Sequence, residues 1–390
     1  MDVPMHPATA TEKGTFMNEL DHFQEAAKNP EGYGKNLKAS GRPVIGCLCS
    51  YAPEELIHAA GAHPMRLFGT KEAIVNADGH LQTYCCSLAK GVLENTLTGR
   101  LSFLDGAVFP HTCDTIQRLS DIWRLNTDYD FFADVVYPVK LNTQSALDYT
   151  VDIFERFKKN LESWSGQSLS EADLTRSIEI FNSIRDQLAE IYRMRSKDPA
   201  CLSGSLLSSV VKGSMILDRD ELPERLFRLR KEIEEGRYAV PGNERKKRLI
   251  VAGSLCDNPN FFSILEESDG VVVWDDLCTG SRYFDETVDI GVPPLEAIAR
   301  RYVERRRPCP AKHLSNTARG EALAAMAEEH KASGVIFFLL KFCDPHAFDY
   351  PYLKEYLETR NVSVTLVEVE NQLPPEGQLK TRLETFIHML

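Results

Sequence analysis

The sequence predicts an α/β protein with two doubly wound, parallel-sheet domains of the flavodoxin or Rossmann type, joined by a helical segment. Short apolar runs alternate with longer amphipathic stretches in two separate regions, and a region with helical periodicity alone lies between them. Strands that alternate with helices along the chain are typical of βαβ units in a parallel sheet. A chain of 390 residues, of which 43% are apolar, is also long enough to bury two separate cores.

The first α/β region begins with RPVIGCLCSYAPEELIHAAGAHPMRLFG, in which two apolar runs flank a helix that begins near Pro53. The next segment, LDGAVFPHTCDTIQRLSDIWRL, predicts a strand and then a helix from about Asp114. The segment DFFADVVYPV predicts the following strand. The other strands of this region are expected over residues 43–48, 64–68 and 106–110.

The second α/β region begins at Lys246 and repeats the pattern, with strands in KRLIVAG, GVVVWDD, GVIFFLL and NVSVTLVEVE and a closing helix in GQLKTRLETFIHML. Between the regions, three stretches over 145–238 place apolar residues at helical spacing, and SLSEADLTRSI offers Ser168 or Ser170 as a helix N-cap. The predicted units are an N-terminal helical extension, a first α/β domain, a helical linking segment and a second α/β domain, over residues 1–42, 43–144, 145–245 and 246–390.

The charge balance argues against nucleic acid as a partner. Acidic residues number 57 and basic residues 45, so the formal net charge is −12. A surface of that sign repels phosphate backbones and anionic lipid headgroups. No stretch within the first 40 residues has the apolar length of a signal-peptide core, and no later stretch has that of a transmembrane helix. We therefore expect a cytoplasmic protein that binds neither nucleic acid nor membrane.

The ten cysteines are expected to be free thiols or metal ligands, because the cytoplasm keeps thiols reduced. Three of them, Cys113, Cys256 and Cys343, each follow an apolar strand and precede an aspartate. Ligands of parallel sheets bind beyond the carboxyl ends of the strands, and a helix N-terminus lowers the pKa of a thiol. The pattern therefore indicates soft-metal binding in a cleft between the domains.

Spacing alone leaves a second interpretation open. Each aspartate can cap the next helix, and each cysteine can fill a small space in the core. The chain has no CxxC pair and these cysteines lie far apart in the sequence, which argues against a compact zinc site. On spacing alone, a metal or iron–sulfur site and a set of core cysteines have equal weight.

Five stretches carry a more specific signal: CSYAPEELIHAAGAHPMRLFG, YCCSLAKGVLENTLTGRLSFLDGAVFPHTCDTIQRLSDIW, DDLCTGSRYF, KFCDPHAFDYPYLKEYLE and GQLKTRLETF. In combination they resemble the 2-hydroxyacyl-CoA dehydratase and benzoyl-CoA reductase subunit family. The resemblance extends from about residue 43 to the C-terminus and leaves out the N-terminal 40 residues and parts of the helical middle.

The resemblance implies a subunit that carries a [4Fe–4S] cluster on three cysteines, which by motif position are Cys86, Cys113 and Cys343. Three thiolates leave one iron of the cubane without a cysteine ligand. Cys85 is an alternative ligand, because the motif requires a single cysteine before Ser87. Cys49 is expected beside the cluster rather than on it. The remaining cysteines are reserve ligands (Cys256, Cys278 and Cys309) or core residues (Cys47 and Cys201).

The reaction that the resemblance implies is one-electron chemistry on an acyl-CoA thioester. A low-potential electron enters the thioester carbonyl, and the resulting ketyl radical anion permits loss of a 2-hydroxyl group or, in the reductases, hydrogenation of an aromatic ring. The chain contains neither G-x-x-x-x-G-K-[ST] nor G-x-G-x-x-G. The expected partners are therefore a separate ATP-hydrolysing iron–sulfur activator protein and a paralogous dehydratase or reductase subunit, in an anaerobic heterodimer.

Ser50, Glu55 and His111 are the catalytic candidates. Ser50 and Glu55 lie at the first predicted strand-to-helix turn, where a hydroxyl can reach the open iron and a carboxylate can move a proton. Helix capping by Ser50 and Glu54 is the structural alternative. His111 precedes Cys113 by two residues and can hydrogen-bond a substrate carbonyl. Weaker candidates, for CoA phosphates or for positioning, are Arg282, Lys341, Glu368, Glu370, Gln378 and Arg382.

Two other functions remain open on the sequence. A homodimeric double-cubane protein would hold an [8Fe–9S] cluster and reduce small molecules in an ATP-dependent reaction. A structural or binding subunit without a cluster would pack its cysteines in the core and be colourless. The iron content and the partner chain distinguish these from the acyl-CoA enzyme.

Overall fold

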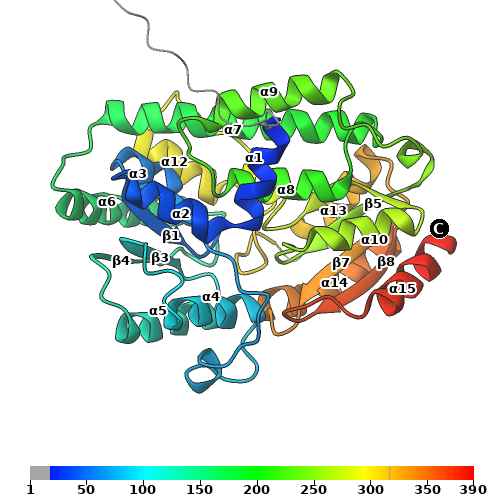
Figure 1. The fold of residues 1–390 in the computed structure, drawn as a ribbon, viewed down its shortest axis with the longest axis horizontal. Helices are drawn as coiled ribbons and strands as arrows, with labels where there is room; N and C mark the ends of the chain where they lie inside the picture. Colours follow the sequence, from blue (N-terminus) through cyan, green and yellow to red (C-terminus); the bar gives the residue numbers. More distant parts are fainter. Residues whose placement is uncertain (1–17, 316) are drawn as a thin grey trace, which may run out of the picture.

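The computed structural model describes residues 18–315 and 317–390, which contain two four-stranded, all-parallel sheets (Figure 1). The first sheet has the order β2-β1-β3-β4 and the second the order β6-β5-β7-β8. In each sheet the chain moves outward in one direction and then returns to the other side of the first strand, which creates a topological switch point. The predicted two-sheet α/β fold is confirmed. Residues 1–17 of the predicted N-terminal extension lie outside the described residues.

The first sheet consists of short strands between helical layers. Its central strands, β1 and β3, are buried along their whole length, as expected for a parallel sheet covered on both faces. The strands are β1 Val44–Cys47, β2 His63–Arg66, β3 Gly106–Pro110 and β4 Phe131–Val135. The helices of this half are α1 Glu19–Lys28, α2 Pro30–Ala39, α3 Glu54–Ala59, α4 Ser87–Leu97 and α5 Asp114–Asn126.

The second sheet has longer strands. β7 pairs with β5 on one side and β8 on the other and is wholly buried, which explains its continuous apolar sequence. At the end of β5, Gly253 pairs with Phe338, and a Cβ at Gly253 would lie 2.0 Å from the Phe338 carbonyl oxygen. The strands are β5 Lys247–Gly253, β6 Gly270–Asp276, β7 Gly334–Leu340 and β8 Ser363–Val369.

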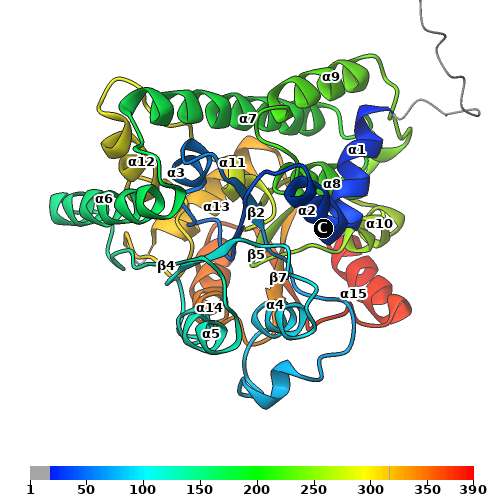
Figure 2. The ribbon, with the colours of Figure 1, turned by 60° about the vertical axis from the view of Figure 1, so that its left-hand side comes forward.

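A group of long helices connects the two halves. Ser170 is the N-cap of α7 and forms a capping box with Asp173, which confirms one of the two predicted caps. α7 lies along the top of the molecule in Figures 1 and 2 and contacts both halves, since Tyr192 donates a hydrogen bond to Asp275 in the second (2.6 Å) and Arg185 binds Glu55 in the first. The connecting helices are α6 Gln144–Ser165, α7 Glu171–Lys197, α8 Gly204–Ser214 and α9 Leu222–Glu234.

The second half adds six helices to its sheet. They are α10 Pro259–Glu267, α11 Ser281–Phe284, α12 Pro294–Val303, α13 Ala318–Glu329, α14 Asp344–Thr359 and α15 Glu376–His388. The helical patterns in the sequence did not predict α4, α8, α12 or α13. No helix of the described residues is long and apolar enough to cross a membrane.

One buried apolar cluster runs through both halves. It includes Phe23 of α1, Leu188 of α7, Val251 of β5 and Ile336 of β7. The connecting helices therefore pack between the sheets as part of the core rather than outside it. The division into four units remains a prediction.

Candidate functional site

Six of the ten cysteines lie near one another, where the two halves meet. The negative charge of one thiolate raises the pKa of its neighbours: Cys113 responds to Cys86, Cys49 and Cys309, and Cys343 responds to Cys86, Cys309 and Cys278. Cys309 in turn responds to Cys278 and Cys49. We call this group the six-thiol site: Cys49, Cys86, Cys113, Cys278, Cys309 and Cys343.

Parallel strands bring these thiols together from distant parts of the sequence. Cys113 follows β3 and is the N-cap of α5, while Cys343 follows β7 and is the N-cap of α14. Cys86 is the N-cap of α4. β3 and β7 occupy equivalent places in the two sheets, each directly beyond the switch point. The ligand-binding edge of each sheet therefore contributes thiols to one shared site.

Cys256 does not share this position. The N-cap of the helix after β5 is Asn258, and Cys256 is buried in the core. Burial raises the pKa of Cys256, and the charges that modulate it are Asp257, Asp275 and Lys71 rather than another cysteine. The equivalence of the three Cys-Asp pairs in the sequence therefore holds for two of them only.

The geometry favours Cys86 over its neighbour as a member of the site. Cys86 is near both Cys113 and Cys343, whose pKa values it raises. The thiol of Cys85 instead contacts the Oε1 atom of Gln82 at 3.8 Å. Cys85 therefore points away from the position where the other thiols converge.

Burial controls the protonation of these thiols. Burial raises the pKa of Cys113 to about 12 and outweighs the N–H group of Ile116, which lowers it. Burial likewise raises the pKa of Cys309 to about 12 and raises the pKa of Cys86. The lowering expected from a helix N-terminus is present but is the smaller effect. The thiols are therefore protonated without a metal, and binding of iron would release protons.

Three buried cations surround the six-thiol site. Arg282, Arg305 and Lys312 are 2%, 3% and 4% exposed. Lys312 donates a hydrogen bond to the Tyr137 carbonyl oxygen (3.2 Å), and the thiolates of Cys309 and Cys49 partly offset the lowering of its pKa by burial. Among the described residues, neither Arg305 nor Lys312 forms an ion pair with a carboxylate. Buried charges require a counter-charge, so an anionic group such as an iron–sulfur cluster bound by thiolates fits this site.

The segment over residues 304–312 carried a signal that sequence reasoning missed. Cys309 stands in RRRPCPAK, between Arg305 on one side and Lys312 on the other. A cysteine flanked by basic residues is a sign of a stabilised thiolate. The structure brings both cations to the thiols, and Arg305 also lies over the rings of Tyr51 and Tyr302, at 4.9 and 5.0 Å.

A cavity of about 540 Å³ opens beside Cys113. Its walls come from the turn after β3, the loop over 308–315 and the start of α14. Lys312 and Arg319 are among its lining residues, and two exposed aromatic side chains, Phe348 and Tyr352, stand at its rim (76% and 70% exposed). The cavity therefore connects solvent with one of the predicted ligands.

Glu55 lies in a different environment. It is fully buried in α3 and forms an ion pair with Arg185 of α7, while its Oε2 atom has no hydrogen-bond partner among the described residues. Burial favours the neutral acid, but Arg185 and Arg301 outweigh it and lower the pKa of Glu55. Glu55 is absent from the lining of the cavity. Its contacts fit a structural ion pair, and the catalytic role remains a prediction.

Ser50 and His111 are closer to solvent and also lie outside the cavity lining. The Nε2 atom of His111 is 2.9 Å from Asp134, which also binds Arg124. The N-cap of α3 is Pro53, without a side-chain cap, so Ser50 and Glu54 do not cap this helix. The roles of Ser50 and His111 remain predictions.

The two candidates for CoA phosphates differ from each other. Arg282 is buried and bonded within the protein, so a bound phosphate could not reach it at the surface. Lys341 is exposed and pairs with Glu370 at 2.6 Å. Only Lys341 is therefore accessible to such a ligand.

No group of three or more His, Cys, Asp or Glu side chains among residues 18–315 and 317–390 is arranged to hold a single metal ion. A cubane makes a different demand, since each of its cysteines binds a different iron atom. Thiols that are near but not in contact are therefore compatible with a cluster and not with a single ion.

The fold and the site define a class of protein: an α/β chain with two flavodoxin-like sheets and a thiol-rich site where their switch points meet. The family model "2-hydroxyglutaryl-CoA dehydratase, D-component" matches residues 49–390. The chain belongs to this family of dehydratase and reductase subunits, which is known to carry iron–sulfur clusters, and the resemblance seen in the sequence is confirmed.

Curated relatives match the chain over nearly its whole length. The (R)-phenyllactyl-CoA dehydratase beta subunit of Clostridium sporogenes is 28% identical, over 96% of this chain and 98% of that protein. The (R)-2-hydroxyglutaryl-CoA dehydratase beta subunit of Acidaminococcus fermentans is 26% identical, over 95% and 98%. A benzoyl-CoA reductase subunit of Thauera aromatica is 26% identical, over 86% and 88%.

Proposed function

We propose that this chain is the iron–sulfur subunit of a 2-hydroxyacyl-CoA dehydratase or benzoyl-CoA reductase, with a [4Fe–4S] cluster on Cys86, Cys113 and Cys343. The observation that carries the proposal is the convergence of these thiols from helix N-caps beyond two different sheets. Such a cluster supplies single electrons of low potential to a CoA thioester.

The chain's own side chains would exclude water from the cluster and hold its charge. The thiols are buried or half-buried, and Lys312 and Arg305 provide positive charge beside them. The cavity beside Cys113 is the route by which a substrate or a partner chain would approach. For proton transfer and substrate binding, Ser50, His111 and Glu55 remain the candidates, with Glu55 the least accessible.

The expected partners are a paralogous subunit and an ATP-hydrolysing iron–sulfur activator. Two of the curated relatives are named beta subunits, and the relative from the benzoyl-CoA reductase is also named as one of several subunits, which supports an assembly with another chain. The chain has no nucleotide-binding glycine loop of its own, which supports a separate activator.

The experiment is purification without oxygen, followed by measurement of iron and acid-labile sulfide per chain and identification of co-purifying chains. We expect about four iron atoms per chain. With the activator, ATP and a low-potential reductant, 2-hydroxyacyl-CoA and benzoyl-CoA thioesters are then offered as substrates. A colourless, iron-free protein under these conditions would return the cysteines to a structural role.

A double-cubane reductase is the second candidate, and one observation favours it. Cys49, Cys278 and Cys309 form a second group of three thiols beside the first, which would be enough for a second cubane. This candidate requires about eight iron atoms per six-thiol site and a self-dimer. Replacing Cys309 with serine distinguishes the two: the iron content falls by half for a double cubane and stays unchanged for a single one.

A further inference from the structure

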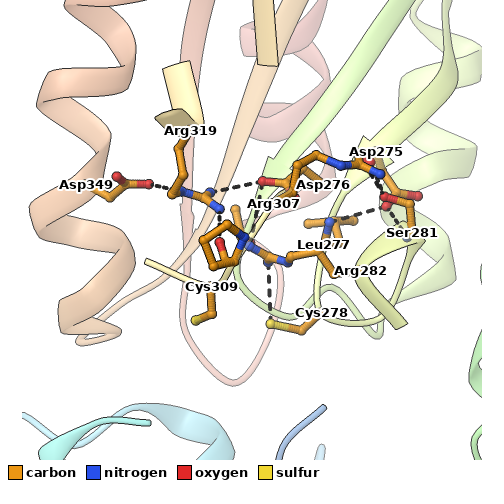
Figure 3. A network of polar contacts seen from close by, with 12 residues as sticks. Asp275, Asp276, Leu277, Cys278, Ser281, Arg282, Arg307, Cys309, Arg319 and Asp349 are labelled. Atoms are coloured by element: carbon orange, nitrogen blue, oxygen red, sulfur yellow. Dashed lines mark hydrogen bonds and ion pairs between the residues drawn. The ribbon is translucent and has the colours of Figure 1, made fainter. Parts of the chain in front are cut away.

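Arg282 and Asp276 lie side by side behind the six-thiol site. Asp276 ends β6, and Cys278 follows it by two residues. Arg282 lies one turn further along, in α11, where its Nη2 atom donates to the Cys278 thiol (3.4 Å) and to the Gly253 carbonyl oxygen. Its Nη1 atom is 3.6 Å from the Oδ2 atom of Asp276 (Figure 3). One guanidinium therefore contacts both a thiol of the site and a buried carboxylate.

The carboxylate of Asp276 is fixed and ionised. Its Oδ2 atom accepts a hydrogen bond from Arg319 (2.9 Å), and Arg319 also binds Asp349 (2.7 Å). Burial would raise the pKa of Asp276, but Arg282, Arg319 and Arg307 outweigh it and lower the pKa. The thiol side of Arg282 thus faces a positive charge whose counter-charge lies on the opposite side, away from the site, as Figure 3 shows.

Arg282 has donors that the protein does not use. Its Nε and Nη1 atoms are buried and have no hydrogen-bond partner among the described residues. Burial lowers the pKa of Arg282, but Asp276 and the thiolates of Cys278 and Cys309 outweigh it, so the guanidinium remains charged. A buried cation with free donors next to sulfur stabilises any additional negative charge placed there.

We propose that Arg282 and Asp276 are positioning residues that set the reduction potential of the iron–sulfur group at the six-thiol site. The inference rests on the proposed function, because it requires that group to be bound. Reduction adds one electron to the group and breaks no bond, so the oxidised form differs from the reduced form by one unit of charge. Net charge and hydrogen bonds to sulfur are known determinants of cluster potential. Arg282 therefore raises the potential and Asp276 lowers it.

The test is a redox titration of the purified holoprotein, monitored by electron paramagnetic resonance, with a low-potential chemical reductant and dye mediators. In Arg282→Gln we expect the ratio of reduced to oxidised group at a given potential to fall about tenfold, a shift of about 59 mV to more negative potential. In Asp276→Asn we expect a shift of the opposite sign. Arg282→Lys keeps the charge and should restore most of the wild-type potential.

Arg195→Gln is the matched control. Arg195 is equally buried and pairs with Glu266 at 2.9 Å, and within the described part of the chain it donates to no thiol of the six-thiol site. Its replacement should leave the potential unchanged. A merely structural role for Arg282 and Asp276 would lower the iron content or the stability of both variants without shifts of opposite sign.

The outcomes separate this inference from the proposed function. Wild-type protein without iron would refute the proposed function and, with it, this inference. Wild-type protein with iron, together with Arg282→Gln and Asp276→Asn variants whose potentials equal the wild-type value or move in the same direction, would refute this inference alone. If Arg282→Gln fails to fold, the sign of the shift in Asp276→Asn decides.

Discussion

The hydroxyl oxygen of Tyr51 accepts a hydrogen bond from the backbone N–H group of Cys309, at 3.3 Å. Tyr51 lies in the loop after β1 of the first sheet, and Cys309 lies in the loop that precedes α13 in the second half. The bond therefore joins the two halves of the molecule at the six-thiol site. The ring of Tyr51 is buried, with the guanidinium of Arg305 over one face.

Replacement of Tyr51 with phenylalanine tests this connection. The ring contacts remain, but the N–H group of Cys309 loses its acceptor, which costs about 1–3 kcal/mol when the group stays buried. Urea denaturation of Tyr51→Phe should show this loss. The same change at the exposed Tyr149 should have no effect. Equal stability of the two variants would mean that the bond contributes nothing.

Glu55→Gln should lower the free energy of unfolding by about 3–5 kcal/mol, because it leaves the charge of Arg185 buried and unpaired. The surface pair of Glu296 and Arg300 (2.6 Å) is the control, and Glu296→Gln should cost less than about 1 kcal/mol. If Glu55→Gln retains full stability and loses only turnover, Glu55 acts in catalysis instead.

The Glu55 ion pair also predicts a pH dependence. The pKa of Glu55 is lowered in the folded protein, so its contribution to stability is complete above the pKa of an unfolded glutamate, about 4.3. The contribution is lost as the pH falls from there through the folded pKa. Acid titration of stability should therefore be steeper for the wild type than for Glu55→Gln between about pH 4.5 and the point of unfolding.

Gly253→Ala should destabilise the protein by about 1–3 kcal/mol, because the new Cβ would meet the Phe338 carbonyl oxygen at 2.0 Å. Gly253 also has a φ of +136°, which side chains other than hydrogen disfavour. Gly79→Ala is the control, since nothing lies within 4 Å of a Cβ there. Thermal unfolding of both variants compares them, and a stable Gly253→Ala protein would show that the strand end can move.

Cys113→Ser and Cys343→Ser should each lower the iron content and abolish activity, because each removes a proposed ligand. Cys256→Ser and Cys85→Ser should keep most of the iron, since these thiols lie outside the six-thiol site. Iron analysis and visible absorbance after anaerobic purification measure all four. Full iron retention in the first two variants, or a colourless protein in either of the last two, would contradict the ligand assignment.

The architecture was predictable because its signals are local. The buried strand β7 and the capping box at Ser170 both show in the order of residues. α8 was missed because GSLLSSVVKGS is rich in glycine, serine and valine, which are poor helix formers. Packing against α1 and α10 stabilises this helix instead, and such contacts cannot be read from the segment itself.

The site was predictable in part for the same reason. Cys113 and Cys343 could be found because each ends a strand in sequence. Lys312 could not, because the contacts that bring it to Cys49 and Cys309 depend on the folded loop and on residues far apart in the chain. The ion pair of Glu55 with Arg185 is also a long-range contact, which is why the sequence favoured a catalytic interpretation of Glu55.

The division of the six-thiol site between the two halves has a consequence for synthesis on the ribosome. The nascent chain presents Cys49, Cys86 and Cys113 early, but Cys343 emerges only after β7, close to the end of translation. The first half can therefore fold while its thiols still lack their counterparts. Any group that needs thiols from both sheets can be inserted only into a nearly finished chain, so its delivery is a late step in the maturation of the protein.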